Sequence, residues 1–178
     1  MRALIYGGSG SGKSALAELL LVSLAGAGEK IYLATMEPFG ADACERIERH
    51  RSMRAEKSFT TIERYTALEG LALPAGCSVL LECLGNLAAN ESFTPNGVGA
   101  EAAAAVERGL EALNRQSAHL VVVSNDIGGD GVDYPVETRA YQRLLGDINR
   151  KLAAESDIVV EVVCGIGIYH KGAQLCGS

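Results

Sequence analysis

Residues Gly7–Ser14 have the sequence GGSGSGKS, which matches the pattern G-x-x-x-x-G-K-[ST] at every position. The stretch follows the apolar run Ala3–Tyr6 and precedes an Ala/Leu-rich segment, which is the strand–loop–helix context of a phosphate-binding loop. Glycines let backbone N–H groups turn toward phosphate oxygens, and the following helix N-terminus adds partial positive charge. The sequence therefore predicts a nucleotide-binding loop. Its expected contacts are Gly7, Gly8, Ser9, Gly10, Ser11, Gly12, Lys13 and Ser14.

Two side chains of this loop carry its chemistry. The Lys13 ammonium is expected to reach the β- and γ-phosphates, and the Ser14 hydroxyl is expected to bind Mg²⁺. Such a loop also needs an acidic residue at the end of a neighbouring strand to hold the hydrated metal. Glu82 and Asp126 are the candidates, and each could instead cap a following turn. Glu82 is favoured because it directly ends the apolar run Ser78–Leu81.

The alternation of apolar runs and helical patterns predicts the fold. Nearly continuous apolar runs are typical of strands buried on both faces of a parallel sheet. With the phosphate-binding loop they predict an α/β fold of the three-layer, RecA-like P-loop NTPase type, in which a mostly parallel sheet has helices on both faces. We expect one domain over residues 1–178. The predicted strands are Ala3–Tyr6, Lys30–Thr35, Ser78–Leu81, Leu120–Ser124 and Ile158–Val163. The predicted helices are Ser14–Ala27, Asp42–Arg54, Ala100–Arg115 and Val136–Ala154.

Two stretches rich in Gly, Pro and Asn, Asn90–Gly99 and Gly128–Pro135, are predicted surface loops. They follow the third and fourth predicted strands. Because ligands of open parallel sheets bind at the carboxyl ends of the strands, both loops are candidate lids.

Composition excludes several classes of protein. The chain has 178 residues and a formal net charge of −6, so it lacks the basic surface that nucleic-acid binding requires. No segment reaches the ~18 apolar residues of a membrane-spanning helix, and the N-terminal sequence lacks signal-peptide features. The cysteines number five, and none has C-x-x-C spacing. We therefore expect a cytoplasmic protein with small-molecule substrates and without nucleic-acid or membrane partners.

A second charged motif surrounds His50. The segment Arg46–Arg54 has a formal charge of +3 within an acidic chain, and Arg46, His50 and Arg54 share one face if the segment is helical. A neutral imidazole can attack phosphorus while neighbouring guanidinium groups bind the phosphate oxygens. The residues also fit a solvated basic helix with a structural histidine. His119 and His170 have no comparable neighbours, and we assign them no role.

Taken together, the motifs resemble the bifunctional adenosylcobinamide kinase / adenosylcobinamide-phosphate guanylyltransferase family of cobalamin synthesis. They occur in the family's order and cover nearly the whole chain. Beyond the phosphate-binding loop, the matching elements are Tyr32–Thr35, R-I-x-x-H-x-x-x-R at Arg46–Arg54, Thr61–Glu63, Leu80–Leu84, Val123–Gly128, Gly146–Ala153 and Val163–Ile166.

The resemblance implies two reactions. A nucleoside triphosphate, ATP or GTP, phosphorylates adenosylcobinamide. GTP then guanylylates a histidine, here His50, and the GMP passes to adenosylcobinamide phosphate, giving adenosyl-GDP-cobinamide. The catalytic residues would be His50 and Lys13, Mg²⁺ would be held by Ser14 and Glu82, and the protein would be a homo-oligomer, by resemblance a trimer. The further GTP contacts implied are Ala34, Thr35, Met36, Arg51, Ser52, Met53, Arg54, Glu63 and Glu82.

The chain departs from the family pattern at several positions away from the loop and the histidine. Ala55 and Phe59 stand where the family has Pro and Trp, and Asn125–Pro135 is longer and more acidic than usual. Two alternatives remain open. One is an enzyme of the same fold that catalyses one of the two steps. The other is a RecA-like regulatory or assembly NTPase without a corrinoid acceptor.

Overall fold

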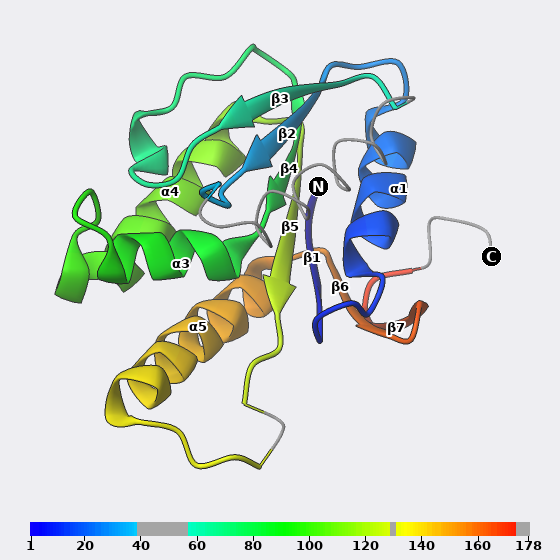
Figure 1. Cartoon of the computed structure of the whole chain (residues 1–178). Helices are drawn as coiled ribbons and strands as arrows, with labels where there is room; N and C mark the ends of the chain where they lie inside the picture. Colours follow the sequence, from blue (N-terminus) through cyan, green and yellow to red (C-terminus); the bar gives the residue numbers. More distant parts are fainter. Residues whose placement is uncertain (39–56, 129–130, 174–178) are drawn as a thin grey trace.

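The computed structural model describes residues 1–38, 57–128 and 131–173 (Figure 1). Seven strands form one sheet in the order β3-β2-β4-β5-β1-β6-β7. All neighbouring strands are parallel except β7, which runs antiparallel to β6. The strands are β1 (Arg2–Gly7), β2 (Lys30–Ala34), β3 (Phe59–Glu63), β4 (Ser78–Glu82), β5 (His119–Asn125), β6 (Ile158–Val163) and β7 (Ile166–Lys171).

Helices cover both faces of the sheet, as Figure 1 shows. Helix α1 packs on one face, and α3, α4 and α5 pack on the other. The mostly parallel, three-layer architecture predicted from the sequence is therefore confirmed. The described α-helices are α1 (Lys13–Ala25), α3 (Leu84–Phe93), α4 (Ala102–Gln116) and α5 (Val136–Glu155), with short 3-10 helices at Leu68–Gly70 and Gly99–Glu101.

Successive residues of each central strand enter opposite cores because side chains alternate across a sheet. In β4, Leu80 packs with the core under α1, whereas Leu81 packs with the core under α3, α4 and α5. Burial on both faces explains why these strands have nearly continuous apolar sequences. Among the described residues, no helix combines the length and the apolar character that a bilayer crossing requires.

Several sequence predictions are corrected. Strands β3 and β7 and helix α3 were absent from the prediction. Because α3 extends to Phe93, the first four residues of the predicted loop Asn90–Gly99 are helical, and the loop starts at Thr94. The predicted helix Asp42–Arg54 lies outside the described residues, as do two residues, 129–130, of the predicted loop Gly128–Pro135.

The topology indicates where a ligand would bind. Strands β1 and β5 are neighbours, but the chain leaves β1 through α1 on one face and reaches α5 on the other face after β5. A crevice opens where adjacent connections diverge in this way, at the carboxyl ends of the strands. The phosphate-binding loop, the end of β4 and the segment after β5 all lie at this edge.

Replacing Leu81 by Ala is expected to lower the free energy of unfolding by about 2–5 kcal/mol, because it leaves a cavity in the central strand. Leu81 is completely buried. Leu19→Ala is the matched control, because Leu19 is 53% exposed on α1 and should change stability by less than about 0.5 kcal/mol. Urea unfolding of both variants measures the difference, and equal losses would contradict the assigned packing.

Candidate nucleotide site

The loop between β1 and α1 has the backbone that its glycines predict. Gly10 and Gly12 have φ values of 71° and 94°, which glycine adopts without steric cost. Helix α1 begins at Lys13, directly after Gly12. The N-terminus of α1 and the loop amides therefore point to the same region, which suits an anionic ligand.

The turn between β6 and β7 supports this loop from behind. Gly165 donates its backbone N–H to the Ser11 carbonyl at 2.8 Å. A Cβ on Gly12 would lie 3.3 Å from the Gly165 Cα. Cys164 and Gly165, with φ values of 50° and 83°, form the tight reversal that brings this turn against the loop. Glycine is needed at position 12 for close approach as well as for its positive φ. Sequence reasoning missed this contact, although a Gly between two apolar runs is a hairpin signal.

Ser14 joins the loop to the sheet. Its Oγ donates a hydrogen bond of 2.6 Å to Glu82 Oε1, at the end of β4. Lys13 is buried, with 8% of its surface exposed, and its Nζ donates to the Gly8 carbonyl at 2.9 Å. Of the two candidate acidic residues, Glu82 is thus in contact with the loop. Asp126 is exposed, and its backbone N–H donates to the Gly7 carbonyl.

The oxygen atoms of Ser14 and Glu82 fit a magnesium site. Mg²⁺ prefers oxygen ligands and is usually bound through one or two side chains together with substrate phosphates and water. Within the described parts of the chain, no three His, Cys, Asp or Glu side chains are grouped as a metal cluster would need. The donor set therefore suits a metal that arrives with a nucleotide better than a permanent structural ion.

Three of the predicted nucleotide contacts meet at the same edge of the sheet. Ala34 is paired with Glu63 of β3 on one side and with Glu82 of β4 on the other. Tyr65 donates its hydroxyl hydrogen to Glu63 Oε2 at 2.9 Å. Met36, two residues beyond β2, is partly exposed. The register of the parallel strands therefore places Ala34 and two carboxylates in one row.

Thr35 is buried, whereas its neighbours Ala34 and Met36 are partly exposed. Its side chain is fully buried, and its Oγ1 donates to the Cys83 carbonyl at 2.8 Å. Its backbone N–H donates to the Glu82 carbonyl, and its own carbonyl accepts from Asn90 Nδ2 at 2.8 Å. The backbone and side-chain polar groups of Thr35 are therefore used within the protein, where they fix the segment after β2 to the end of β4. Asn90 was read from the sequence as a loop residue, and its role was missed.

Two titratable side chains near the end of β4, Cys83 and Tyr141, are neutral at neutral pH. Burial, with a smaller contribution from the Glu82 charge, raises the pKa of the Cys83 thiol to about 11. Burial also raises the pKa of Tyr141 to about 12, and its hydroxyl donates to the Gly85 carbonyl at 2.7 Å. At neutral pH the Cys83 thiol is therefore protonated and is a poor nucleophile. Cys83 belongs to the core under α1, and Tyr141 packs against the core under α3, α4 and α5.

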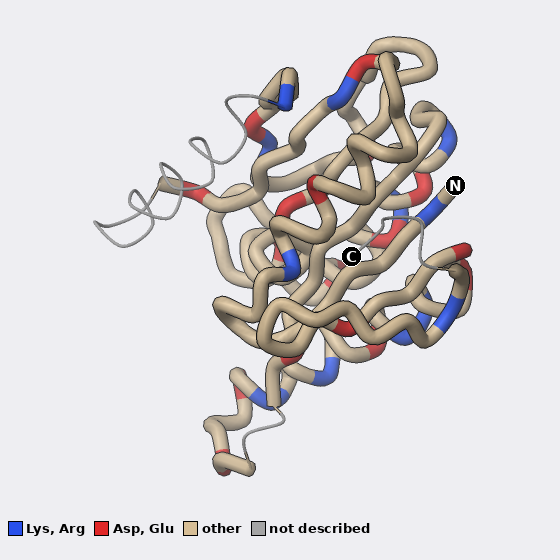
Figure 2. The backbone as a smooth tube through the Cα atoms, turned by 90° about the vertical axis from the view of Figure 1, so that its right-hand side faces the viewer, with Lys and Arg blue, Asp and Glu red and all other residues tan. Residues whose placement is uncertain are grey.

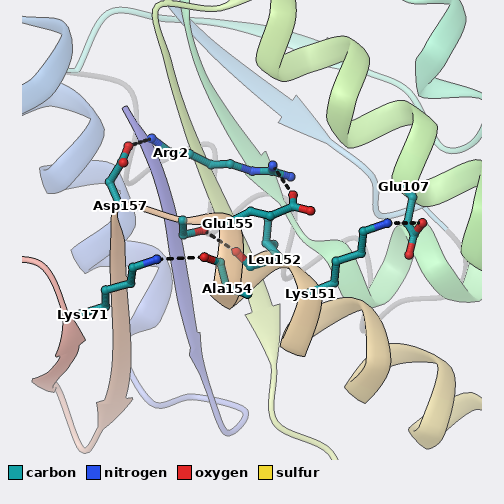
Figure 3. Close-up of polar contacts among 9 residues, drawn as sticks. Arg2, Glu107, Lys151, Leu152, Ala154, Glu155, Asp157 and Lys171 are labelled. Carbon is teal, nitrogen blue, oxygen red and sulfur yellow. Dashed lines mark hydrogen bonds and ion pairs between the residues drawn. The ribbon is translucent and has the colours of Figure 1, made fainter.

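Charged side chains at the opposite end of the sheet form hydrogen bonds and ion pairs that connect secondary-structure elements. Figure 3 shows Arg2, at the start of β1, donating through its backbone N–H to Asp157 and through its side chain to Glu155. Lys151 of α5 pairs with Glu107 of α4. These contacts connect α4, α5 and the first strand at the amino ends of the parallel strands. Figure 2 shows acidic and basic positions interspersed along the described backbone.

The described histidines lie outside the nucleotide site. His119 begins β5 at the amino end of the sheet, where burial and the nearby N-terminal ammonium lower its pKa. His170 of β7 contacts Glu161 of β6 at 3.0 Å. The predicted catalytic residue His50 lies outside the described residues, together with Arg46 and the predicted GTP contacts Arg51, Ser52, Met53 and Arg54.

A phosphate-binding loop after β1, faced by a carboxylate at the end of β4, defines a P-loop NTPase fold, and solved structures agree. An ATPase from the type III secretion system of pathogenic bacteria is similar over 97% of this chain and 58% of its own, with a TM-score of 0.52 and 14% identity. Flagellar accessory protein FlaH from Methanocaldococcus jannaschii is similar over 99% of this chain and 80% of its own, with a TM-score of 0.51 and 13% identity. At these identities the likeness concerns the fold.

The sequence narrows this class to one family. A family model described as cobinamide kinase / cobinamide phosphate guanyltransferase matches residues 3–169. The bifunctional adenosylcobalamin biosynthesis proteins CobU of Escherichia coli and Salmonella typhimurium are each 31% identical over 96% of this chain and 100% of their own length. The chain therefore belongs to the cobinamide kinase / cobinamide phosphate guanyltransferase family of enzymes, and the resemblance seen in its motifs is confirmed.

Gly12→Ala is expected to weaken binding of GTP with Mg²⁺ by about tenfold or more, because alanine is strained at this φ and its Cβ would press on Gly165. Gly146→Ala is the control, because a Cβ at Gly146 in α5 would meet no atom within 4 Å. That variant should bind normally and be slightly more stable. Calorimetric titration measures both affinities. Normal binding by Gly12→Ala would refute the proposed support of the loop.

Proposed function

We propose that the protein phosphorylates adenosylcobinamide and then transfers GMP from GTP to adenosylcobinamide phosphate through a guanylyl-histidine at His50. The contact between Ser14 and Glu82 is the structural observation that carries the proposal, because it joins the phosphate-binding loop to the row of predicted nucleotide contacts. Membership of the family supplies the substrates. Its description names both activities, and the match covers nearly the whole chain.

In the kinase step, the loop amides and the N-terminus of α1 bind the triphosphate. Lys13 neutralises charge on the β- and γ-phosphates as the terminal phosphoryl group moves to the acceptor hydroxyl. Ser14 and Glu82 are the residues that would hold Mg²⁺, which supplies further charge neutralisation when it is bound. Catalysis of this kind depends on position and electrostatics, and the packing of Gly165 behind the loop fixes that position.

In the GMP-transfer step, an imidazole nitrogen of His50 bonds to the α-phosphorus of GTP while the bond to the pyrophosphate oxygen breaks. A phosphate oxygen of adenosylcobinamide phosphate then takes the GMP, and His50 is released. Arg51 and Arg54 would stabilise charge on the pyrophosphate, with Ser52 and Met53 beside them. The row at Ala34, with Met36, Glu63 and Glu82, would contact the nucleotide.

We also propose the domain organisation, the location and the oligomeric state of the working protein. One sheet includes strands from Arg2 to Lys171, which supports a single domain. The described cysteines, Cys77, Cys83 and Cys164, are free thiols, which fits the cytoplasm.

We propose a homotrimer by the family resemblance. Ile166 and Ile168 are exposed on the edge strand β7, where an assembly could cover them. The bifunctional enzyme is preferred over the two alternatives because the curated relatives are named bifunctional.

Incubation with GTP labelled at the α-phosphate should leave one acid-labile, base-stable label on the wild-type chain, because a phosphoramidate forms at His50. His50→Ala should carry no label. His119→Ala and His170→Ala are the controls and should be labelled like the wild type. Absence of label from the wild type, or equal label on His50→Ala, would reject the covalent step.

Lys13→Ala is expected to reduce phosphorylation of adenosylcobinamide by about a hundredfold or more, because no other cation of the loop reaches the transferred phosphate. Lys151→Ala removes a lysine at the opposite end of the sheet and should retain activity. Chromatographic separation of adenosylcobinamide phosphate measures the product. Normal turnover by Lys13→Ala would exclude the proposed kinase site.

A further inference from the structure

Glu18 is a buried acidic residue without a part in the proposed chemistry. Its side chain is completely buried on α1. One carboxylate oxygen, Oε2, pairs with Lys57 Nζ, and the other, Oε1, has no hydrogen-bond partner among the described residues. A carboxylate removed from water is costly unless it is paired. Lys57 is the described partner of the buried Glu18 carboxylate. Its positive charge therefore offsets the cost of burying that carboxylate.

Lys57 fixes the entry of the chain into β3. The next residue, Ser58, has a φ of 55°, a left-handed conformation that is uncommon for a residue with a side chain. Phe59 then begins β3 and meets the ring of Tyr32 edge-on, with ring centres 6.3 Å apart. An ion pair, a backbone reversal and an aromatic contact thus occur at three consecutive residues. They attach this point of the chain to α1 and to β2.

The pair connects two parts of the proposed enzyme. Glu18 is four residues after Ser14 on α1, so both side chains lie on the same side of the helix, one turn apart. Lys57 follows Arg54, the end of the proposed GMP-transfer motif, by three positions in the sequence. The phosphate-binding loop, in contrast, is held by separate contacts from Glu82 and Gly165. Loss of the pair should therefore affect the two reactions unequally.

We propose that Glu18 and Lys57 form a positioning pair for GMP transfer, which fixes the chain at Lys57, three residues after Arg54 in the sequence, to the helix that binds the triphosphate. The proposal rests on the proposed function. Neither residue touches a reacting atom. The pair acts by holding the chain at one end of the histidine motif, and small displacements of a nucleophile are enough to reduce rates strongly. The kinase step does not use that motif and should not depend on the pair.

The test compares Lys57→Met with Lys57→Arg in full-length protein, using GMP incorporation from GTP and kinase activity as separate readouts. Lys57→Met should slow GMP incorporation by about tenfold or more, and kinase activity should stay within about twofold of the wild type. Lys57→Arg keeps the charge and should recover most of the incorporation rate. Lys151→Met is the matched control, because it breaks an exposed pair with Glu107 and should change neither activity.

The double variant Glu18→Gln/Lys57→Met separates positioning from stability. It removes the buried charge along with its partner, so its melting temperature should recover relative to Lys57→Met. We expect GMP incorporation to stay low, because the connection is still absent. Recovery of incorporation together with stability would overturn the proposal, as would equal loss of both activities in Lys57→Met. Failure of the proposed function can be distinguished from failure of the positioning pair. If the proposed function is wrong, the wild type itself incorporates no GMP.

Discussion

The hydrogen bond from Ser14 to Glu82 is the contact around which the rest of the site is arranged. It forms because strands β1 and β4 are parallel and end at the same edge of the sheet, although 68 residues separate the two side chains in the sequence. The loop can reach Glu82 only if its backbone turns sharply at Gly10 and Gly12. The β6–β7 turn then packs against the loop, so that a Cβ at Gly12 would lie only 3.3 Å from the Gly165 Cα.

The central fold could be predicted because its strands are buried on both faces, which leaves long apolar runs in the sequence. The edge strands could not be predicted in this way. In β3, three of five residues are exposed, and in β7 the exposed Ile166 and Ile168 flank Gly167. Helix α3 was missed because Gly85, Asn86 and Asn90 favour loops in isolation. Tertiary packing overrides this preference, because Leu84 and Leu87 of α3 are completely buried in the core.

The part of the site that is continuous in sequence could be predicted, whereas contacts between residues distant in the sequence could not. The phosphate-binding loop is eight consecutive residues, so its pattern could be recognised directly. Glu82 could be preferred to Asp126 because it directly ends the apolar run Ser78–Leu81, and the contact with Ser14 supports that choice. Asn90 and Gly165 act through contacts with residues distant in the sequence, and local pattern indicates at most a turn at Gly165, not these contacts. The role of His50 came from resemblance to the family and remains a prediction.

We propose that the phosphate-binding loop and the end of β4 form one site for a nucleotide with Mg²⁺. A double-mutant cycle on Ser14→Ala and Glu82→Gln tests it most directly, with GTP affinity in the presence of Mg²⁺ measured by calorimetry for the wild type, both single variants and the double variant. We expect a coupling free energy of about 1 kcal/mol or more, because each residue loses much of its effect without the other. Effects that add within about 0.3 kcal/mol would show that Ser14 and Glu82 act independently and do not form one site.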